Sequence, residues 1–378
     1  MSAGRLGKVG SASDATEIIY VMDGRNYMKT ATGKHYNIID AMKLVMAFFI
    51  VMGHTNPLTD VSPEADYFVV QYMIRVAVPF FFVAAGFFLF GKFPDRQISM
   101  AVIGRYIKRI FRMFFAWICI YLPLVLWYYR NTYSDWEGCL ALVWTFFFVD
   151  MGFHLWFLIA LIWAVLFLAI LFRYKVKMRT IFFITLLCYI PALLGHAYYG
   201  LFLYICPEGS YTYECVRVLQ HIFITPRNGI CYAAVYMFMG AYVAFHNYDI
   251  ARCRLVLLTA LSWLLFLGEV IFVKELNWLL NGDAYVMLLP VTFFTFLLAR
   301  QIEVRDLPVY RHLRQMSILV YLIHPVFLVI FRLLSEGGIY QASHLMLCGL
   351  TMLISCLSAE VIMYLSGKRY GEIFKLLS

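Results

Sequence analysis

The chain has 378 residues, of which 63% are hydrophobic and only 14% are charged. Soluble domains are about half apolar and about one quarter charged, so this composition excludes a soluble globular protein and predicts an all-α polytopic membrane protein. The net charge of +9 is interpreted by position, because Lys and Arg collect in the cytoplasmic loops of membrane proteins. It does not indicate nucleic-acid binding. The nine cysteines lack metal-site spacing, so no metal is expected.

Residues 1–35 are polar and basic and have almost no apolar periodicity. We expect a mobile cytoplasmic tail without a cleavable signal peptide. A membrane domain is expected over residues 36–366, followed by a cytoplasmic C-terminal tail over 367–378. Cys206 and Cys215 share one loop and could form a disulfide if that loop is exported.

The first predicted membrane helix, Tyr36–His54, has a wholly apolar middle and polar ends. At about 100° per residue, Asp40, Lys43 and His54 project from one face, and His54 lies about 15–20 Å along the axis from the other two. Two interpretations remain open. The polar ends serve a reaction that is supplied from both sides of the bilayer, or they simply face the lipid headgroups.

Hydropathy and loop charge together predict about ten membrane helices, with both termini on the cytoplasmic side of the cell membrane. The loop at 55–66 has no Lys or Arg, as expected for an external loop. The expected helices cover 36–54, 67–90, a third segment that follows the basic stretch and runs to about 129, and then 155–172, 180–198, 228–246, 255–273, 284–299, 316–334 and 344–366.

The apolar stretch Cys139–Val149 is too short to cross a hydrocarbon core of about 30 Å. If it did cross, the basic loop Arg173–Arg179 would face outward, against the positive-inside rule. We therefore expect residues 138–150 to form one short re-entrant or interfacial helix, which is tolerated where it lines protein or a wet cavity.

Ionisable residues at membrane depth are costly to bury and therefore indicate candidate functional sites. Arg75 lies inside the second helix and either serves the site or forms an ion pair with a neighbouring helix. His324 lies in the middle of a helix before Pro325 and is either functional or a packed histidine beside a kink. Glu269, near a helix end, is expected to reach water.

Two further pairs lie where the membrane meets water. Arg109 and Arg112 share one face at the cytoplasmic start of the third helix and either bind an anion or anchor the helix. His154 and Trp156 follow the short helix at the outer interface, where aromatic residues are common.

These elements, in their order and spacing, resemble the acyltransferase-3 family of bacterial integral-membrane acyltransferases over roughly residues 36–366. The family's opening I-D-x-x-R helix, which ends in histidine, is matched by Ile39–Lys43 and His54. Its V-P-F-F-F-x-x-S-G-F segment is matched by Val78–Phe87, its R-x-x-R run by Arg109 and Arg112, its H-x-W element by His154–Leu158, and its S-x-x-x-Y-L-I-H-P element by Ser317–Pro325. The chain is also similar to the membrane part of the vancomycin-resistance serine racemases.

The resemblance implies a membrane O-acyltransferase that uses acyl-CoA, in the first instance acetyl-CoA, and a glycan or other hydroxyl acceptor outside the cytoplasm. Two positions depart from the family pattern, because lysine replaces arginine at Lys43 and alanine replaces serine at Ala85. The alternatives are a transporter of a small polar solute such as serine, and a non-catalytic family member. A homo-oligomer is compatible with the sequence.

The expected roles follow from the same comparison. His54 is the candidate general base, because the pKa of imidazole lies near operating pH. Cations near the cytoplasmic side would bind the CoA phosphates, and Asp40 would have a structural role, pairing Lys43. Arg75 would orient the acceptor or stabilise the oxyanion. The cofactor-binding candidates are Lys43, Arg109 and Arg112; the substrate-binding candidates are Arg75, His154, Trp156 and His324.

Overall fold

The computed structural model describes residues 36–93, 96–132, 155–214, 216, 227–246, 250–338, 342–368 and 376–377. Within these ranges every regular element is a helix. The elements are α1 (Asn37–Thr55), α2 (Pro63–Phe68), a π turn (Val69–Met73), a 3-10 turn (Ile74–Val76), α3 (Ala77–Phe90), α4 (Met100–Thr132), α6 (Trp156–Arg173), α7 (Met178–Leu194), α8 (Tyr199–Ile205), a second π turn (Gly229–Ala233), α10 (Ala234–Phe245), α11 (Arg252–Glu275), α12 (Leu288–Gln301), α13 (Pro308–Glu336) and α14 (His344–Ser366).

The described part of the chain is that of a multi-pass membrane protein. Six helices are long and apolar enough to cross a membrane, or seven if α7 and α8, which meet at 89°, form one broken span. Two shorter apolar helices cover Gly229–Phe245 and Leu288–Gln301. The predicted count of about ten spans is therefore not confirmed, and the expected short helix at 138–150 lies outside the described residues.

The second predicted helix corresponds to one of these six candidate spans, Pro63–Phe90, but irregular turns interrupt its α-helix. Its first turn is fixed by Ser62, whose side chain accepts a hydrogen bond from the backbone of Ala65, and by Pro63 at the first helical position. A π turn and a 3-10 turn then separate α2 from α3. Such irregular turns are frequently found at functional sites, and here they carry Arg75.

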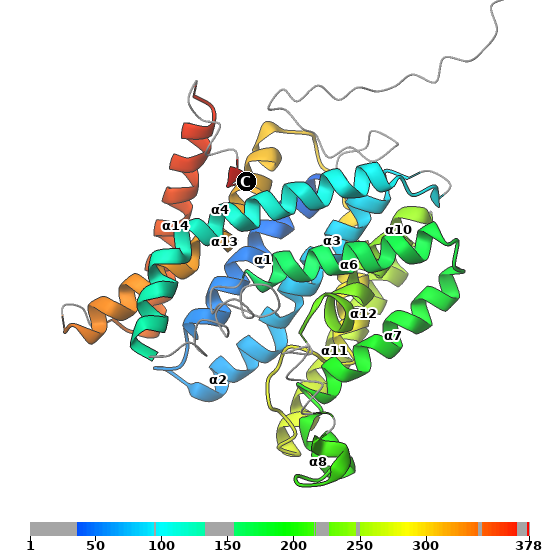
Figure 1. Cartoon of the computed structure of the whole chain (residues 1–378), viewed down its shortest axis with the longest axis horizontal. Coiled ribbons are helices and arrows are strands. Elements are labelled where there is room, and N and C mark those ends of the chain that lie inside the picture. The colour runs from blue at the N-terminus through cyan, green and yellow to red at the C-terminus, as the bar shows by residue number, and fades with distance from the viewer. Residues whose placement is uncertain are drawn as a thin grey trace, which may run out of the picture.

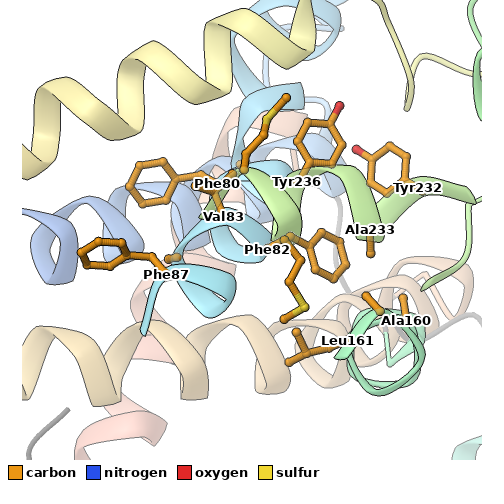
Figure 2. Packing of buried hydrophobic residues seen from close by; sticks show 14 of the residues in the cluster. Phe80, Phe82, Val83, Phe87, Ala160, Leu161, Tyr232, Ala233 and Tyr236 are labelled. Carbon is orange, nitrogen blue, oxygen red and sulfur yellow. The ribbon is translucent and has the colours of Figure 1, made fainter. Parts of the chain in front are cut away.

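The tightest helix pair is α3 against α10. A Cβ placed on Gly86 would lie 2.1 Å from the backbone oxygen of Met237, and one placed on Gly240 would lie 2.0 Å from that of Val83. Small residues allow membrane helices to approach this closely. Figure 2 shows the surrounding core, in which Phe82 of α3 lies beside Tyr232 of the π turn that leads into α10.

Helix α1 occupies the middle of the bundle, with α13 and α14 towards one side and α7 and α11 towards the other (Figure 1). It packs mainly against α13, α3 and α14. One end of α1 carries Asp40 and Lys43 and the other end carries His54. The helix therefore carries candidate functional residues at both of its ends.

Candidate functional site

Two cavities lie along α1. The first, here called the basic cavity, contains about 1020 Å³ of empty space, counting the part open to solvent. The second, the histidine cavity, contains about 580 Å³ by the same measure and is lined by His54. Since one cavity reaches Lys43 and the other reaches His54, they correspond to the two polar ends that the sequence places on one face of α1.

The basic cavity has a charged end and an apolar interior. Lys43, Lys92, Arg109 and Arg314 line the charged end, and Lys92 and Arg109 are exposed, so the cavity opens to solvent there. Its interior is lined by apolar and aromatic residues of α1, α3, α6 and α13, among them Phe81, Ala84, Ala85, Phe157 and Leu161. A molecule with an anionic head and a thin, less polar arm fits this distribution.

Asp40 holds two of the four cations in place. Its carboxylate accepts from Lys43 Nζ at 3.1 Å and from Arg314 Nη1 at 3.4 Å. The ammonium of Lys43 also lies 4.5 Å from the ring centre of Phe88, a cation–π contact. One carboxylate facing four cations leaves an excess of positive charge at this end among the described residues.

The pKa of Lys92 reflects this excess of positive charge. It lies in the turn after α3, and although its side chain retains exposed surface, burial lowers its pKa below the usual value and repulsion from Arg109 and Arg105 lowers it further. Close positive charges disfavour one another and favour a bound anion. Arg112, which the sequence paired with Arg109, is exposed and lies outside the lining of this cavity.

Two imidazoles stack at the histidine cavity, and only that of His54 lines it. The rings of His54 and His324 are 5.6 Å apart between centroids and inclined by 22°. His324 is fully buried, and its Nδ1 donates to the backbone oxygen of Val320 at 3.1 Å, which fixes the tautomer with the proton on Nδ1. His54 has exposed surface in the cavity, whereas His324 lies behind it and lines neither cavity.

A charged cluster faces His54 across the same cavity. The carboxylate of Asp283 accepts from Arg75 Nη1 at 2.6 Å and from Arg227 Nη1 at 2.9 Å, and His196 Nδ1 lies 3.7 Å from it. The guanidinium of Arg227 also lies 4.5 Å from the ring centre of Trp156. The ion-pair partner of Arg75 is thus in the loop between α11 and α12, not on a neighbouring helix.

Asp283 is held in its ionised form. Burial alone would raise the pKa of its carboxyl, but the guanidiniums of Arg227 and Arg75 and the ring of His196 together lower the pKa below its ordinary value. Neither Asp283 nor Arg227 belongs to a motif that the sequence analysis identified. The signal for Arg227 was its place in the loop between the expected helices 180–198 and 228–246, which is external in the ten-helix topology with a cytoplasmic N-terminus, where basic residues are uncommon.

Glu269 positions the loop that carries this aspartate. It is buried and accepts from Tyr198 Oη at 2.6 Å and from the backbone nitrogens of Val286 and Met287, each at 2.7 Å. The two backbone donors directly precede α12, so Glu269 caps the start of that helix. The expectation that Glu269 reaches water was wrong, because the following loop folds back over it.

The two cavities meet at three side chains. Ile50, Val78 and Tyr321 line both of them. The ring of Tyr321 lies 6.2 Å from that of Phe81 and 5.6 Å from that of Phe157, measured between centroids. The basic cavity and the histidine cavity therefore share part of their walls.

The remaining predicted residues are placed as follows. Trp156 lines the histidine cavity, whereas His154 lies outside the described residues. Cys206 is a free thiol, and Cys215 is also outside the described residues. Among the residues that the structure describes, no group of three or more His, Cys, Asp or Glu is arranged to hold a metal ion.

Among known proteins, the chain is similar to enterococcal amino-acid racemases. The chain is 26% identical over 266 residues to an "Amino-acid racemase" of Enterococcus faecalis, covering 69% of this chain and 35% of that protein. It is 27% identical over 294 residues to a "Serine/alanine racemase" of Enterococcus gallinarum, covering 76% and 40%. The chain spans less than half the length of these relatives.

No solved structure matches the chain. The family model described as "Acyltransferase domain", that of the acyltransferase-3 family, matches residues 36–361, which is most of the chain. This family supports membrane acyltransferase activity in general, while the names of the relatives leave the specific activity open. The chain belongs to the acyltransferase-3 family.

Proposed function

We propose that this protein is a membrane O-acyltransferase that moves an acyl group, acetyl in the simplest case, from cytoplasmic acyl-CoA to a hydroxyl of an extracytoplasmic or lipid-linked glycan. One observation carries the proposal. A basic cavity with an apolar interior and a cavity lined by a histidine meet at Ile50, Val78 and Tyr321. A donor and an acceptor that enter from opposite ends would meet at these three residues.

The basic cavity suits the donor. CoA carries several phosphate charges at one end and a thin pantetheine arm at the other. Lys43, Lys92, Arg109 and Arg314 supply charge-assisted bonds to phosphates, and the arm would extend through the apolar interior towards Tyr321. Because CoA is cytoplasmic, this end of the bundle and both termini are assigned to the cytoplasm, in agreement with the basic loops.

The histidine cavity suits the acceptor. His54 would accept the proton of the acceptor hydroxyl as its oxygen attacks the thioester carbonyl carbon. A C–O ester bond forms, the C–S bond breaks, and the proton passes from the imidazole to the departing thiolate, so the histidine is regenerated. His324 stacks on His54 and would hold its ring in position, and Arg75 would orient the acceptor.

A transporter of a small polar solute is the second candidate. Cavities at both ends of one helix that share three lining side chains are compatible with alternating access, and one relative is named a serine/alanine racemase. A non-catalytic family member is compatible with the substitutions at Lys43 and Ala85. Neither alternative requires acyl-CoA, so binding of acetyl-CoA separates them from the enzyme.

The test is calorimetric binding of acetyl-CoA to protein in nanodiscs, followed by transfer of the radiolabelled acetyl group. Arg109→Gln should weaken binding by very roughly 1.5–3 kcal/mol, the typical contribution of a charge-assisted hydrogen bond. Arg112→Gln should weaken it less, because Arg112 lies outside the cavity lining. Arg179→Gln, the matched control, removes the same charge at the exposed start of α7. Absence of acetyl-CoA binding in wild type would refute the proposal.

A further inference from the structure

Among the described residues, the polar wall of the histidine cavity carries two arginines and one carboxylate. Arg75 and Arg227 both contact Asp283, and all three residues line the cavity. Arginine does not lose its proton in proteins, and Asp283 is held ionised. Two fixed positive charges therefore face one negative charge, which leaves one net positive charge among the described residues of this wall.

The two guanidiniums are held in place before any ligand arrives. Arg75 Nε donates to Gln71 Oε1 at 3.0 Å while its Nη1 bonds Asp283. Arg227 is held by the same carboxylate and by the face of Trp156. Their side chains keep only 24% and 27% of their surface exposed. Groups fixed in this way bind a partner with little further loss of conformational entropy.

A neutral polyol does not need this arrangement. Its hydroxyls can be held by backbone groups or neutral side chains, and they gain little from a net positive wall. An anion gains from both guanidiniums, since planar carboxylate and phosphate groups accept paired N–H bonds from arginine. His54 lines the same cavity, so a ligand whose anionic group lies on the arginines can present a hydroxyl to the imidazole.

We propose that the acceptor is an acidic hydroxyl compound, held in the histidine cavity by a carboxylate or phosphate on Arg75 and Arg227. This inference specifies the acceptor class of the proposed acyltransferase, and it rests on that function for the fate of the hydroxyl. The arginine pair is a binding site for the acceptor's anionic group and does not itself react.

Three probes that differ only at one position test the charge. Methyl α-D-glucoside is neutral, methyl α-D-glucuronide carries a carboxylate, and the 6-phosphate of methyl α-D-glucoside carries a phosphate. Their dissociation constants are measured by calorimetry on the full chain in nanodiscs. We expect at least one anionic probe to bind about 10-fold to 100-fold more tightly than the neutral one, as one charge-assisted bond implies. The preferred anion identifies the acidic group.

Variants distinguish a binding site from a merely structural cluster. Arg227→Gln should reduce the anionic preference to near unity. Asp283→Asn should preserve or increase it, because the carboxylate that competes with the ligand is gone while both arginines remain. Arg332→Gln, exposed near the end of α13, is the control and should change nothing. A structural cluster would lose binding of every probe equally in both cavity variants.

The inference is overturned if the three probes bind equally, if none binds, or if folded Asp283→Asn loses the anionic preference. These results are independent of the acyl transfer itself. If the wild type prefers the anionic probe but neither binds acetyl-CoA nor transfers acetyl to the probe, the acidic site is supported and the acyltransferase function is refuted. If the wild type binds all three probes with equal affinity and acetylates them, the acyltransferase function is supported and the acidic site is refuted.

Discussion

Replacing Gly240 by alanine tests how closely α3 and α10 must pack. The added Cβ would lie 2.0 Å from the backbone oxygen of Val83 and 2.6 Å from the backbone nitrogen of Phe87, whereas ordinary contacts begin near 3.4 Å. Backbone cannot rotate away, so the helices would have to separate by roughly 1.4 Å, the difference between 3.4 and 2.0 Å. Overpacking of this kind costs about 1–3 kcal/mol.

Alanine recovers up to about 1 kcal/mol of that cost through its better helix propensity, so we expect Gly240→Ala to lower the unfolding free energy by about 1–2 kcal/mol. Helix α3 also supplies Phe81, Ala84 and Ala85 to the basic cavity, and its displacement should weaken acetyl-CoA binding as well. Unfolding free energies would be measured by circular dichroism in mixed detergent and dodecyl sulfate micelles.

The matched control is Gly268→Ala in α11, where an added Cβ meets nothing within 4 Å. This variant should be as stable as wild type or slightly more stable, with unchanged acetyl-CoA affinity. Equal stability of Gly240→Ala and Gly268→Ala would refute the inference that close α3–α10 packing holds the cavity wall.

Three further changes test the charged groups. Asp40→Asn leaves Lys43 and Arg314 without their shared carboxylate and should lower the unfolding free energy by about 3–5 kcal/mol. Added CoA should restore part of this loss, and an unfolding curve equal to that of wild type would contradict the prediction. Because its surroundings lower the pKa of Lys92 below 10.5, this residue loses its charge earlier than an ordinary lysine as pH rises. A thioether analogue of acetyl-CoA should therefore bind more weakly as the pH approaches ~10, near the lysine reference pKa. Lys92→Arg should remove this pH dependence, and wild-type binding that does not change with pH would argue against a phosphate contact. Glu269→Gln should weaken binding of methyl glucuronide but not of acetyl-CoA, since one amide oxygen cannot replace a carboxylate that accepts three hydrogen bonds. Equal losses of affinity for both ligands would instead indicate general unfolding.

Much of the helical framework could be predicted from hydropathy. The expected ranges 155–172, 255–273 and 344–366 fall within two or three residues of α6, α11 and α14, because long apolar runs bounded by basic residues have only one reasonable assignment. The shared face of Asp40 and Lys43 followed from helical periodicity, and the structure places their side chains in contact.

The wall opposite His54 could not be predicted in the same way. Asp283 and Arg227 lie in irregular segments, and the contact between them depends on how two loops fold over the bundle. The irregular turns before α3 were missed because a largely apolar sequence such as Val69–Met73 is equally compatible with an α-helix and a π turn. Glu269 was misjudged because its partners, two backbone amides and a tyrosine, are supplied by tertiary structure.

The most direct test of the central claim concerns His54. Wild type and His54→Ala, matched for folded protein in proteoliposomes, would be compared for transfer of the radiolabelled acetyl group of acetyl-CoA to the three methyl glycosides. Loss of a general base typically lowers a rate by about 10²–10⁴, and acetyl-CoA binding should be unchanged, because His54 lines only the histidine cavity. Transfer that falls to this extent with intact acetyl-CoA binding is the expected result; equal transfer rates in the two proteins would contradict the assignment of His54 as the base.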